Sequence, residues 1–567
     1  MSKRRKGSAG RGGAGLWPEA VLTALGRQAR AEWFGSPLHR LLISRPRVTG
    51  FVVFPRDFRP PHAETGLAIL SGLYDFAGRA LMVDPGGDPW NRASPSRGFA
   101  AELHKFGWLR HLMAADETGP REALRLVLEW GRVFGRWNSF SWGGEILERR
   151  VFNLACAMGA LAAQASDAET ERLASLLARQ ARQLLKIRDP GQRAAERAVA
   201  AATAAAMLPG RAGDQLLART LKRINRVLPQ AVLPDGGHVS RSPEAALDLL
   251  LDLLSLDDGW AQRGFEAPLE AARAIDRLTA AMRFFTLPDG RLARFQGGED
   301  GDPADIAAAR AHDDAEAAPP TFHAPHSGYQ RLSGKTIQVM LDAGAPAAGI
   351  WSLSACAQTG AIEVVCGGER LITNSGWSSR VPDGQAMRLT DGGSAAALGH
   401  ASTGRLLGGW PGRVLGPWLV GGPRKVEAKR SASDAGIWLD LSHDGWVRAF
   451  GLVHERRLFL DLIADELRGE EQFTPTGPPL SRLVPYTVHF HLPPEVEAAV
   501  ARDNKSVLLR GPSQKGWWLR NDAVDVRVEP AVHFRDGRQI MSLQVVLMGH
   551  VHADKGGRVR WKLARVQ

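Results

Sequence analysis

Two polar side chains beside an expected helix start are the best candidates for proton-transfer chemistry. His238 and Arg241 lie three residues apart in LPDGGHVSRSP (233–243), and the following Ser-Pro-Glu supplies an N-cap, a first-turn proline and a first-turn acid. An imidazole exchanges protons near neutral pH, and a guanidinium neutralises a carboxylate. The alternative is structural, because polar groups at loop ends usually bond the backbone. We take His238 and Arg241 as the candidate catalytic pair.

A second segment, RWNSFSWGGEILERRVFNL (136–154), has the composition of a sugar-binding surface. An aromatic ring offers a stacking platform, and polar neighbours offer hydrogen bonds to hydroxyl groups. The candidate substrate-binding residues are therefore Trp142, Glu145, Arg149 and Asn153. The alternative is a packed helix start whose charges face solvent.

Metal and thiol chemistry have weaker support. His489-x-His491 and His550-x-His552 each place two imidazoles on one face of a strand, but neither pair has a CxxC or HExxH companion. We therefore expect no cofactor and no metal. The three cysteines cannot build a disulfide framework, and Cys356 is most simply a small buried strand residue.

The composition excludes several classes of protein. Of 567 residues, 44% are hydrophobic, which is too many for wholesale disorder, and no run of about 18 uncharged apolar residues exists to span a membrane. The length indicates two or three domains. The net charge of +12 favours an acidic partner, whether polysaccharide, nucleic acid or lipid surface.

The first half of the chain has helical periodicity. Apolar residues recur at intervals of three and four over 147–161, 217–228 and 247–254, and alanine dominates 154–208 except for a break at 189–191. Short connections between such helices predict antiparallel helical hairpins.

After residue 320 the period changes to two. Nine short apolar or alternating segments predict strands in two stacked antiparallel sheets. These segments are 337–342, 362–366, 370–373, 436–441, 456–463, 506–510, 524–530, 541–548 and 558–563.

These patterns predict an α+β multidomain chain. We expect a disordered basic tail (1–16), a helical domain (17–296), a linker rich in Gly, Pro, Asp and Ala (297–320), and a β-sandwich (321–567). The first fourteen residues lack the apolar run of a secretory signal, so the expected location is cytoplasmic. Attraction of nucleic acid to the tail would be non-specific.

Six segments in order resemble the heparinase II/III family, and the resemblance runs from about residue 40 to the end. They are LHKFGWLRHL (103–112), RWNSFSWGGEILERRVFNL (136–154), LPDGGHVSRSP (233–243), FTLPDGRLARFQGGED (285–300), SGYQRL (327–332) and FGLVHERRLFLDLIADELRGEEQF (450–473). The resemblance implies an N-terminal incomplete α/α toroid, similar to that of alginate lyases, joined to a C-terminal antiparallel β-sandwich. It also implies a bacterial polysaccharide lyase that acts on uronate-containing glycans.

The implied reaction is β-elimination on an acidic polysaccharide. A base removes the C5 proton of a uronate while a neutralising side chain binds the carboxylate, and the 4-O glycosidic bond breaks. Relatives that act on polymers outside the cytoplasm make the periplasm or cell envelope an alternative location. Relatives of this family can also bind a structural divalent ion in the sandwich. Such a metal site is therefore the alternative to our expectation that the protein has no cofactor.

Three positions depart from the family pattern. Ala245 stands where active relatives carry the tyrosine after Ser-Pro, and Cys356 stands where they carry a strand histidine. The expected Asn-His segment is missing, since only Asn225 lies between 154 and 230, and the chain has just three tyrosines. The alternative function is therefore a non-catalytic glycan-binding or envelope-assembly protein on the same scaffold.

Overall fold

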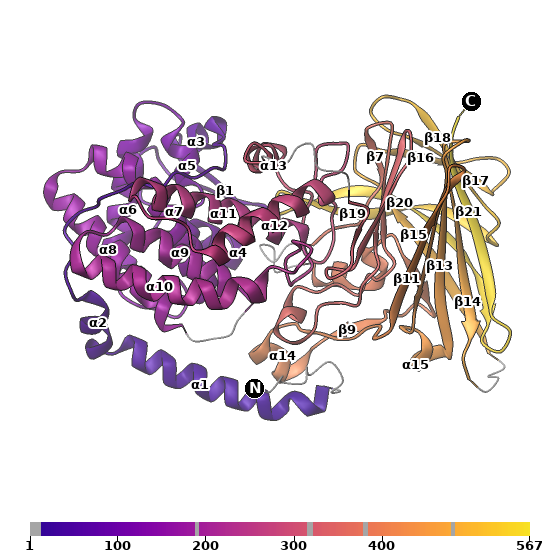
Figure 1. Ribbon diagram of the computed structural model, residues 1–567, viewed down its shortest axis with the longest axis horizontal. Coiled ribbons are helices and arrows are strands. Elements are labelled where there is room, and N and C mark those ends of the chain that lie inside the picture. The colour runs from indigo at the N-terminus through magenta and orange to yellow at the C-terminus, as the bar shows by residue number, and fades with distance from the viewer. Residues whose placement is uncertain (1–12, 188–191, 314–320, 378–383, 478–481, 567) are drawn as a thin grey trace.

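The computed structural model describes residues 13–187, 192–313, 321–377, 384–477 and 482–566. A helical domain and a β-sandwich lie side by side along the long axis of the molecule (Figure 1). The predicted incomplete toroid followed by an antiparallel sandwich is therefore confirmed. None of the described helices is both long enough and apolar enough to cross a bilayer.

The helical domain is built around the alanine-rich helix α9 (Ala194–Met207). Its side chains are nearly all buried, and it contacts α7, α8, α10 and α11. Alanine favours the helix and its small side chain lets the neighbouring helices approach closely. The helices of this half are α1 (Trp17–Gly35), α2 (Pro37–Ser44), α3 (Ala63–Leu70), α4 (Arg97–Lys105), α5 (Leu109–Met113), α6 (Gly119–Phe134), α7 (Gly144–Gln164), α8 (Asp167–Lys186), α10 (Gly210–Ala231), α11 (Pro243–Gln262), α12 (Leu269–Phe285) and α13 (Pro303–Arg310).

A short hairpin, β1 (Leu73–Phe76) and β2 (Arg79–Met82), lies within this domain. The predicted cap of α11 is also present, because the Ser242 side chain accepts a hydrogen bond from the Ala245 backbone N–H. The predicted break at 189–191 lies outside the described residues.

The sandwich consists of one large sheet facing two smaller ones. The large sheet has the order β11-β12-β13-β14-β21-β18-β17-β16, and the others have the orders β19-β20-β15-β8 and β3-β4-β5-β6-β7. A bridge between Thr373 and His491 links the two smaller sheets. All nine predicted strand segments lie within or overlap strands of these sheets.

The strands and helices of the sandwich half have the following bounds: β3 (His323–Ala324), β4 (Tyr329–Ser333), β5 (Ile337–Asp342), β6 (Ile362–Cys366), β7 (Glu369–Ile372), β8 (Ala396–Leu398), β9 (Gly404–Leu406), α14 (Gly409–Leu415), β10 (Leu419–Gly421), β11 (Val426–Ala432), β12 (Gly436–His443), α15 (Val447–Phe450), β13 (Leu452–Asp461), β14 (Glu466–Pro475), β15 (Leu483–His491), β16 (Glu497–Val500), β17 (Ser506–Arg510), β18 (Gly516–Asn521), β19 (Asp525–Arg535), β20 (Arg538–His552) and β21 (Gly557–Arg565).

Two expected disordered segments contain ordered structure. Within the predicted linker, α13 forms because Asp302 caps its N-terminus, and Asp300 is buried in an ion pair with Arg294 at 2.7 Å. Residues 314–320 lie outside the described residues. In the predicted tail, residues 13–16 form a 3₁₀ turn whose Leu16 packs under α14, while residues 1–12 are outside the description.

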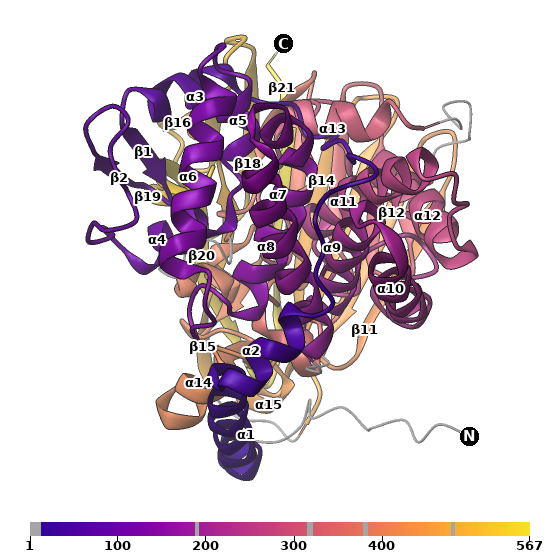
Figure 2. The same cartoon turned by 90° about the vertical axis from the view of Figure 1, so that its left-hand side faces the viewer.

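The first helix lies along one edge of the molecule, next to α14. Figures 1 and 2 both place α1 and α14 together at this lower edge. Trp17 stacks on Trp410 with ring centroids 5.2 Å apart, and Ala20 is fully buried against the sandwich side. The opposite face of α1 is uncovered and carries Val21, Leu22, Leu25 and Trp33, each at least 43% exposed.

The core of the sandwich contains a charged cluster centred on Glu471. Its carboxylate accepts hydrogen bonds from Arg456, from His454 at 2.8 Å and from the Trp561 indole at 3.1 Å, and all four side chains are buried. Burial alone would raise the pKa of Glu471, but Arg456 and His454 outweigh it and lower that pKa to about 2.

Replacing Glu471 with Gln is expected to destabilise the fold by about 3–5 kcal/mol, because Arg456 then remains charged in the core without a counter-charge. Chemical denaturation measures the loss. The control is Glu470→Gln on the same strand, which removes a surface pair with Arg560 and should cost less than about 1 kcal/mol. Equal losses in the two variants would contradict a special role for the buried cluster.

Candidate functional site

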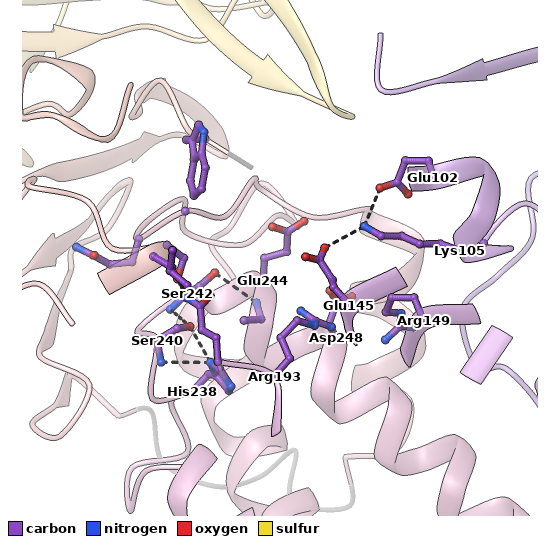
Figure 3. Close-up of a pocket in the computed structure, with 18 of the residues that line it drawn as sticks. Glu102, Lys105, Glu145, Arg149, Arg193, His238, Ser240, Ser242, Glu244 and Asp248 are labelled. Carbon is purple, nitrogen blue, oxygen red and sulfur yellow. Dashed lines mark hydrogen bonds and ion pairs between the residues drawn. The ribbon is translucent and has the colours of Figure 1, made fainter. Parts of the chain in front are cut away.

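The candidate site is a cleft of about 600 Å³ between the helical domain and the sandwich. Its walls come from α4, α7 and α11 on one side and from the loops around Gln296, Ser354 and Trp377 on the other. Four of the six predicted site residues line it: Glu145, Arg149, Asn153 and His238. Figure 3 shows the side chains of this cleft.

His238 lies at the base of the cleft and is 3% exposed. Its Nδ1 accepts the Ser240 backbone N–H at 3.2 Å and lies 2.7 Å from the Ser240 hydroxyl, so a neutral ring carries its proton on Nε2. Burial, together with the nearby Arg193, lowers the pKa of His238 to about 3. The imidazole is therefore neutral at physiological pH, and the lone pair on its Nδ1 already accepts a hydrogen bond from the Ser240 backbone.

Arg241 does not line the cleft but clamps the two domains together. It ends the toroid loop before α11 in a left-handed conformation, with φ of 68°, and its guanidinium pairs with Asp342 on β5. The same group donates to the carbonyls of Ser327, Gly328 and Ala345 and lies 4.9 Å from the ring of Tyr329. These bonds use all but one of the N–H groups of the guanidinium and hold it outside the lining of the cleft, away from a substrate carboxylate.

The surroundings of Arg241 are shaped to admit it. A Cβ atom at Gly344 would lie 2.5 Å from the guanidinium, so a larger residue there would displace Arg241 from its partners. Gln296 donates to the second oxygen of Asp342 at 2.7 Å, and the Tyr329 hydroxyl donates to the Arg241 carbonyl at 2.6 Å. The structure therefore supports the structural role of Arg241, between the two domains, rather than the catalytic role.

The segment predicted to bind sugar is split between core and cleft. Trp142 is 3% exposed and its indole donates to the Phe134 carbonyl at 2.9 Å, so its ring is packed at the start of α7. Asn153 donates to the Lys105 carbonyl at 2.8 Å at the edge of the cleft. Glu145 and Arg149 face the cleft within ion pairs.

Sequence reasoning missed several residues of the cleft. Lys105 bridges Glu102 and Glu145, as Figure 3 shows, and Arg193 pairs with the buried Glu148 at 2.8 Å. Lys105 stands within LHKFGWLRHL and Arg193 stands just before the alanine-rich helix, so the sequence shows both only as charged residues near helices. Their pairing was not visible, because the partners lie up to 45 residues away.

The three positions that depart from the family pattern offer no base. Ala245 lines the cleft with a methyl group. Cys356 is 2% exposed, its thiol faces the Ser354 carbonyl, and burial raises its pKa to about 12. Asn225 is exposed on α10, away from the cleft.

The tyrosines do not compensate. Tyr74, Tyr329 and Tyr486 are all buried and none lines the cleft. Tyr329 is the nearest in the fold, but its hydroxyl is bonded to the Arg241 carbonyl and burial raises its pKa well above 10.

The histidine pairs do not form a metal centre within the described part of the chain. No group of three or more His, Cys, Asp or Glu side chains there is arranged to hold a metal ion. His491 has both ring nitrogens engaged, with the Ser375 hydroxyl and with the Asp391 carbonyl.

Comparisons with known proteins agree with the fold. Residues 316–562 match the family model described as Heparinase II/III-like, C-terminal. The chain is 50% identical over 566 residues to FtsZ-localized protein C from Caulobacter vibrioides (strain NA1000 / CB15N), covering 98% of this chain and 97% of that protein.

Solved structures of polysaccharide lyases share the architecture at low sequence identity. The crystal structure of heparinase III superposes with a TM-score of 0.69 at 14% identity, covering 97% of this chain and 92% of that one. A mutant of the heparan sulfate lyase HepC from Pedobacter heparinus gives 0.57 at 13% identity, covering 99% and 92%. At this identity the likeness shows the fold alone.

Replacing Arg241 with Gln is expected to destabilise the protein by about 3–5 kcal/mol, because Asp342 is left buried and unpaired at the domain boundary. Calorimetry should show the single unfolding transition shift down or divide into two. Arg273→Gln, which breaks an exposed pair on α12, serves as the control. An unchanged transition in the Arg241 variant would show that the domains are held together elsewhere.

Proposed function

The chain belongs to the heparinase II/III-like family, and on that premise we propose that it is a non-catalytic member whose cleft holds a saccharide without cleaving it. Family and fold relate the chain to polysaccharide lyases. The observation that carries the proposal is that the described residues lining the cleft include no tyrosine and no histidine with a free acceptor nitrogen.

β-Elimination needs a group that accepts the C5 proton at neutral pH. A general base must be deprotonated, within hydrogen-bond reach and close in pKa to its task. His238 has its acceptor nitrogen occupied and a pKa of about 3, and Ala245 has no functional group. The reaction also needs a group that neutralises the uronate carboxylate, and Arg241 is committed to Asp342.

We also propose that the chain localises with FtsZ, as the name of its Caulobacter relative states for that protein. The support is 50% identity over almost the full length of both chains. A fluorescent fusion tests the overlap with FtsZ and, in the same cells, the cytoplasmic location that the sequence predicts.

A second role, docking on an anionic membrane surface, has its own support in the N-terminal helices. Eight of the 22 exposed large apolar side chains among the described residues fall within 17–42. On α1, Val21, Leu22, Leu25 and Trp33 follow the spacing of one helical stripe. The preceding MSKRRKGSAGRGG is basic, and a helix that combines an apolar stripe with basic residues lies in the membrane interface.

The purified chain is expected to release no unsaturated uronate from heparin, heparan sulfate, hyaluronan or alginate, because no tyrosine is among the described residues lining the cleft and the acceptor nitrogen of His238 is occupied. Ultraviolet absorbance of the product measures this, with heparinase III as the positive control. Turnover by the wild-type chain that disappears in His238→Gln, with folding intact, would overturn the non-catalytic proposal.

The variant Leu22→Asp/Leu25→Asp is expected to lose at least about tenfold in affinity for phosphatidylglycerol vesicles, because burying each leucine contributes more than about 1 kcal/mol. Co-sedimentation measures the binding, and phosphatidylcholine vesicles test the need for anionic lipid. The control is Ile463→Asp, which removes an 81% exposed apolar side chain from the sandwich. Equal binding by both variants would contradict docking through α1.

A further inference from the structure

Every described cation that lines the cleft is already paired with a carboxylate. The five are Arg59, Lys105, Arg110, Arg149 and Arg193. Lys105 lies 2.9 Å from Glu102 and 3.0 Å from Glu145. Burial opposes its charge, but the two glutamates outweigh burial and raise the pKa of Lys105.

The arginines are held in the same way. Arg149 contacts Asp252 at 2.5 Å, and Arg59 contacts the same carboxylate at 2.8 Å. When only the shortest ion pair of each cation is compared, the longest of these joins Arg110 to Asp57 at 3.7 Å. These pairs are partly or fully buried, so a ligand anion must displace a carboxylate rather than simply add to an exposed cation.

The described lining of the cleft carries as many carboxyl groups as cations, five of each, and the carboxyl groups are Glu102, Glu145, Glu244, Asp248 and Asp305. Four more carboxyl groups stand behind the walls as ion-pair partners of these cations: Asp57, Glu148, Glu196 and Asp252. Burial raises the pKa of Glu148 and of Glu196. The described lining itself therefore has no excess of cations.

The described walls of the cleft therefore show none of the excess of cations that gives the chain as a whole its charge of +12. We propose that the cleft selects a saccharide segment without net negative charge and excludes the polyanionic chains expected from the family resemblance. This inference rests on the proposed saccharide-binding function and narrows its ligand class. It replaces the acidic polysaccharide as the partner of this cleft.

The remaining lining groups suit an uncharged sugar. Asn153, Gln192 and Gln385 place amide groups around the cleft, and amides both donate to and accept from hydroxyl groups. Carboxylate oxygens accept hydrogen bonds from sugar hydroxyls without any need for a counter-ion. Ala245 and Gly107 leave the space between these groups open.

The test compares neutral and anionic tetrasaccharides by calorimetry on the full chain. The neutral probes are gluco-, manno- and N-acetylglucosamine tetramers, and the anionic probes are heparin and hyaluronan tetramers. A neutral probe is expected to bind with less than about a twofold change between about 50 and about 500 mM salt, because no charge pairing is involved.

A blocking variant assigns the binding to the cleft, since the basic tail also attracts polyanions. Ala245→Trp fills the cleft from the first turn of α11 and is expected to weaken neutral-probe binding at least about tenfold. Ala261→Trp, exposed near the end of the same helix, should bind as the wild type does. Stronger binding of an anionic probe that Ala245→Trp abolishes would overturn the inference and leave saccharide binding intact.

A charge variant tests the reason for the selectivity. Glu102→Gln/Glu145→Gln frees Lys105 and is expected to gain at least about fivefold in affinity for the heparin tetramer at low salt, with the gain lost at high salt. Glu270→Gln on α12 is the matched control, because it frees Arg273 outside the cleft. No gain would show that charge is not what excludes the anion. Failure of every saccharide to bind would overturn the proposed function itself.

Discussion

The ion pair between Arg241 and Asp342 is the constraint on which the cleft depends. It joins a toroid loop to a sandwich strand at positions 101 residues apart, and both groups are buried. Neither charge tolerates burial alone, so separating the domains carries the cost of two unpaired charges. Gln296, Tyr329 and Gly344 pack around the pair, and the same loops form the walls of the cleft. The pair therefore fixes the distance between those walls.

The distribution of charge separates the surface of the molecule from its cleft. The excess of lysine and arginine over acid belongs to the chain as a whole, with five of these cations in the first twelve residues. The described lining of the cleft holds as many carboxyl groups as cations, and each of these cations is paired. A whole-chain charge indicates how the protein approaches a partner. It does not describe a site in which local pairs have already neutralised the field.

Periodicity predicted the elements well, because apolar spacing is a local property. The strand predicted over 337–342 has those bounds in β5, and the apolar spacing of 147–161 lies within α7. Side-chain roles depended on distant partners. Arg241 looked available in sequence but meets Asp342, and Trp142 looked like a platform but packs into the core. The linker prediction was wrong in part because acidic residues such as Asp300 gain a buried partner, Arg294, that composition does not reveal.

The residues at and around the positions that depart from the family pattern are already engaged in hydrogen bonds of their own. The Cys356 backbone is held by Gln296, which also holds Asp342, and His238 is fixed by Ser240 instead of facing an open proton acceptor. The substitution Ala245→Tyr alone would add a base. It would not add the side chain that neutralises the substrate carboxylate and so lowers the barrier to removal of the C5 proton. Buried ion pairs contribute little net stability compared with apolar packing of the same volume. A polar cleft of about 600 Å³ built from such pairs is therefore best explained by a ligand that it binds.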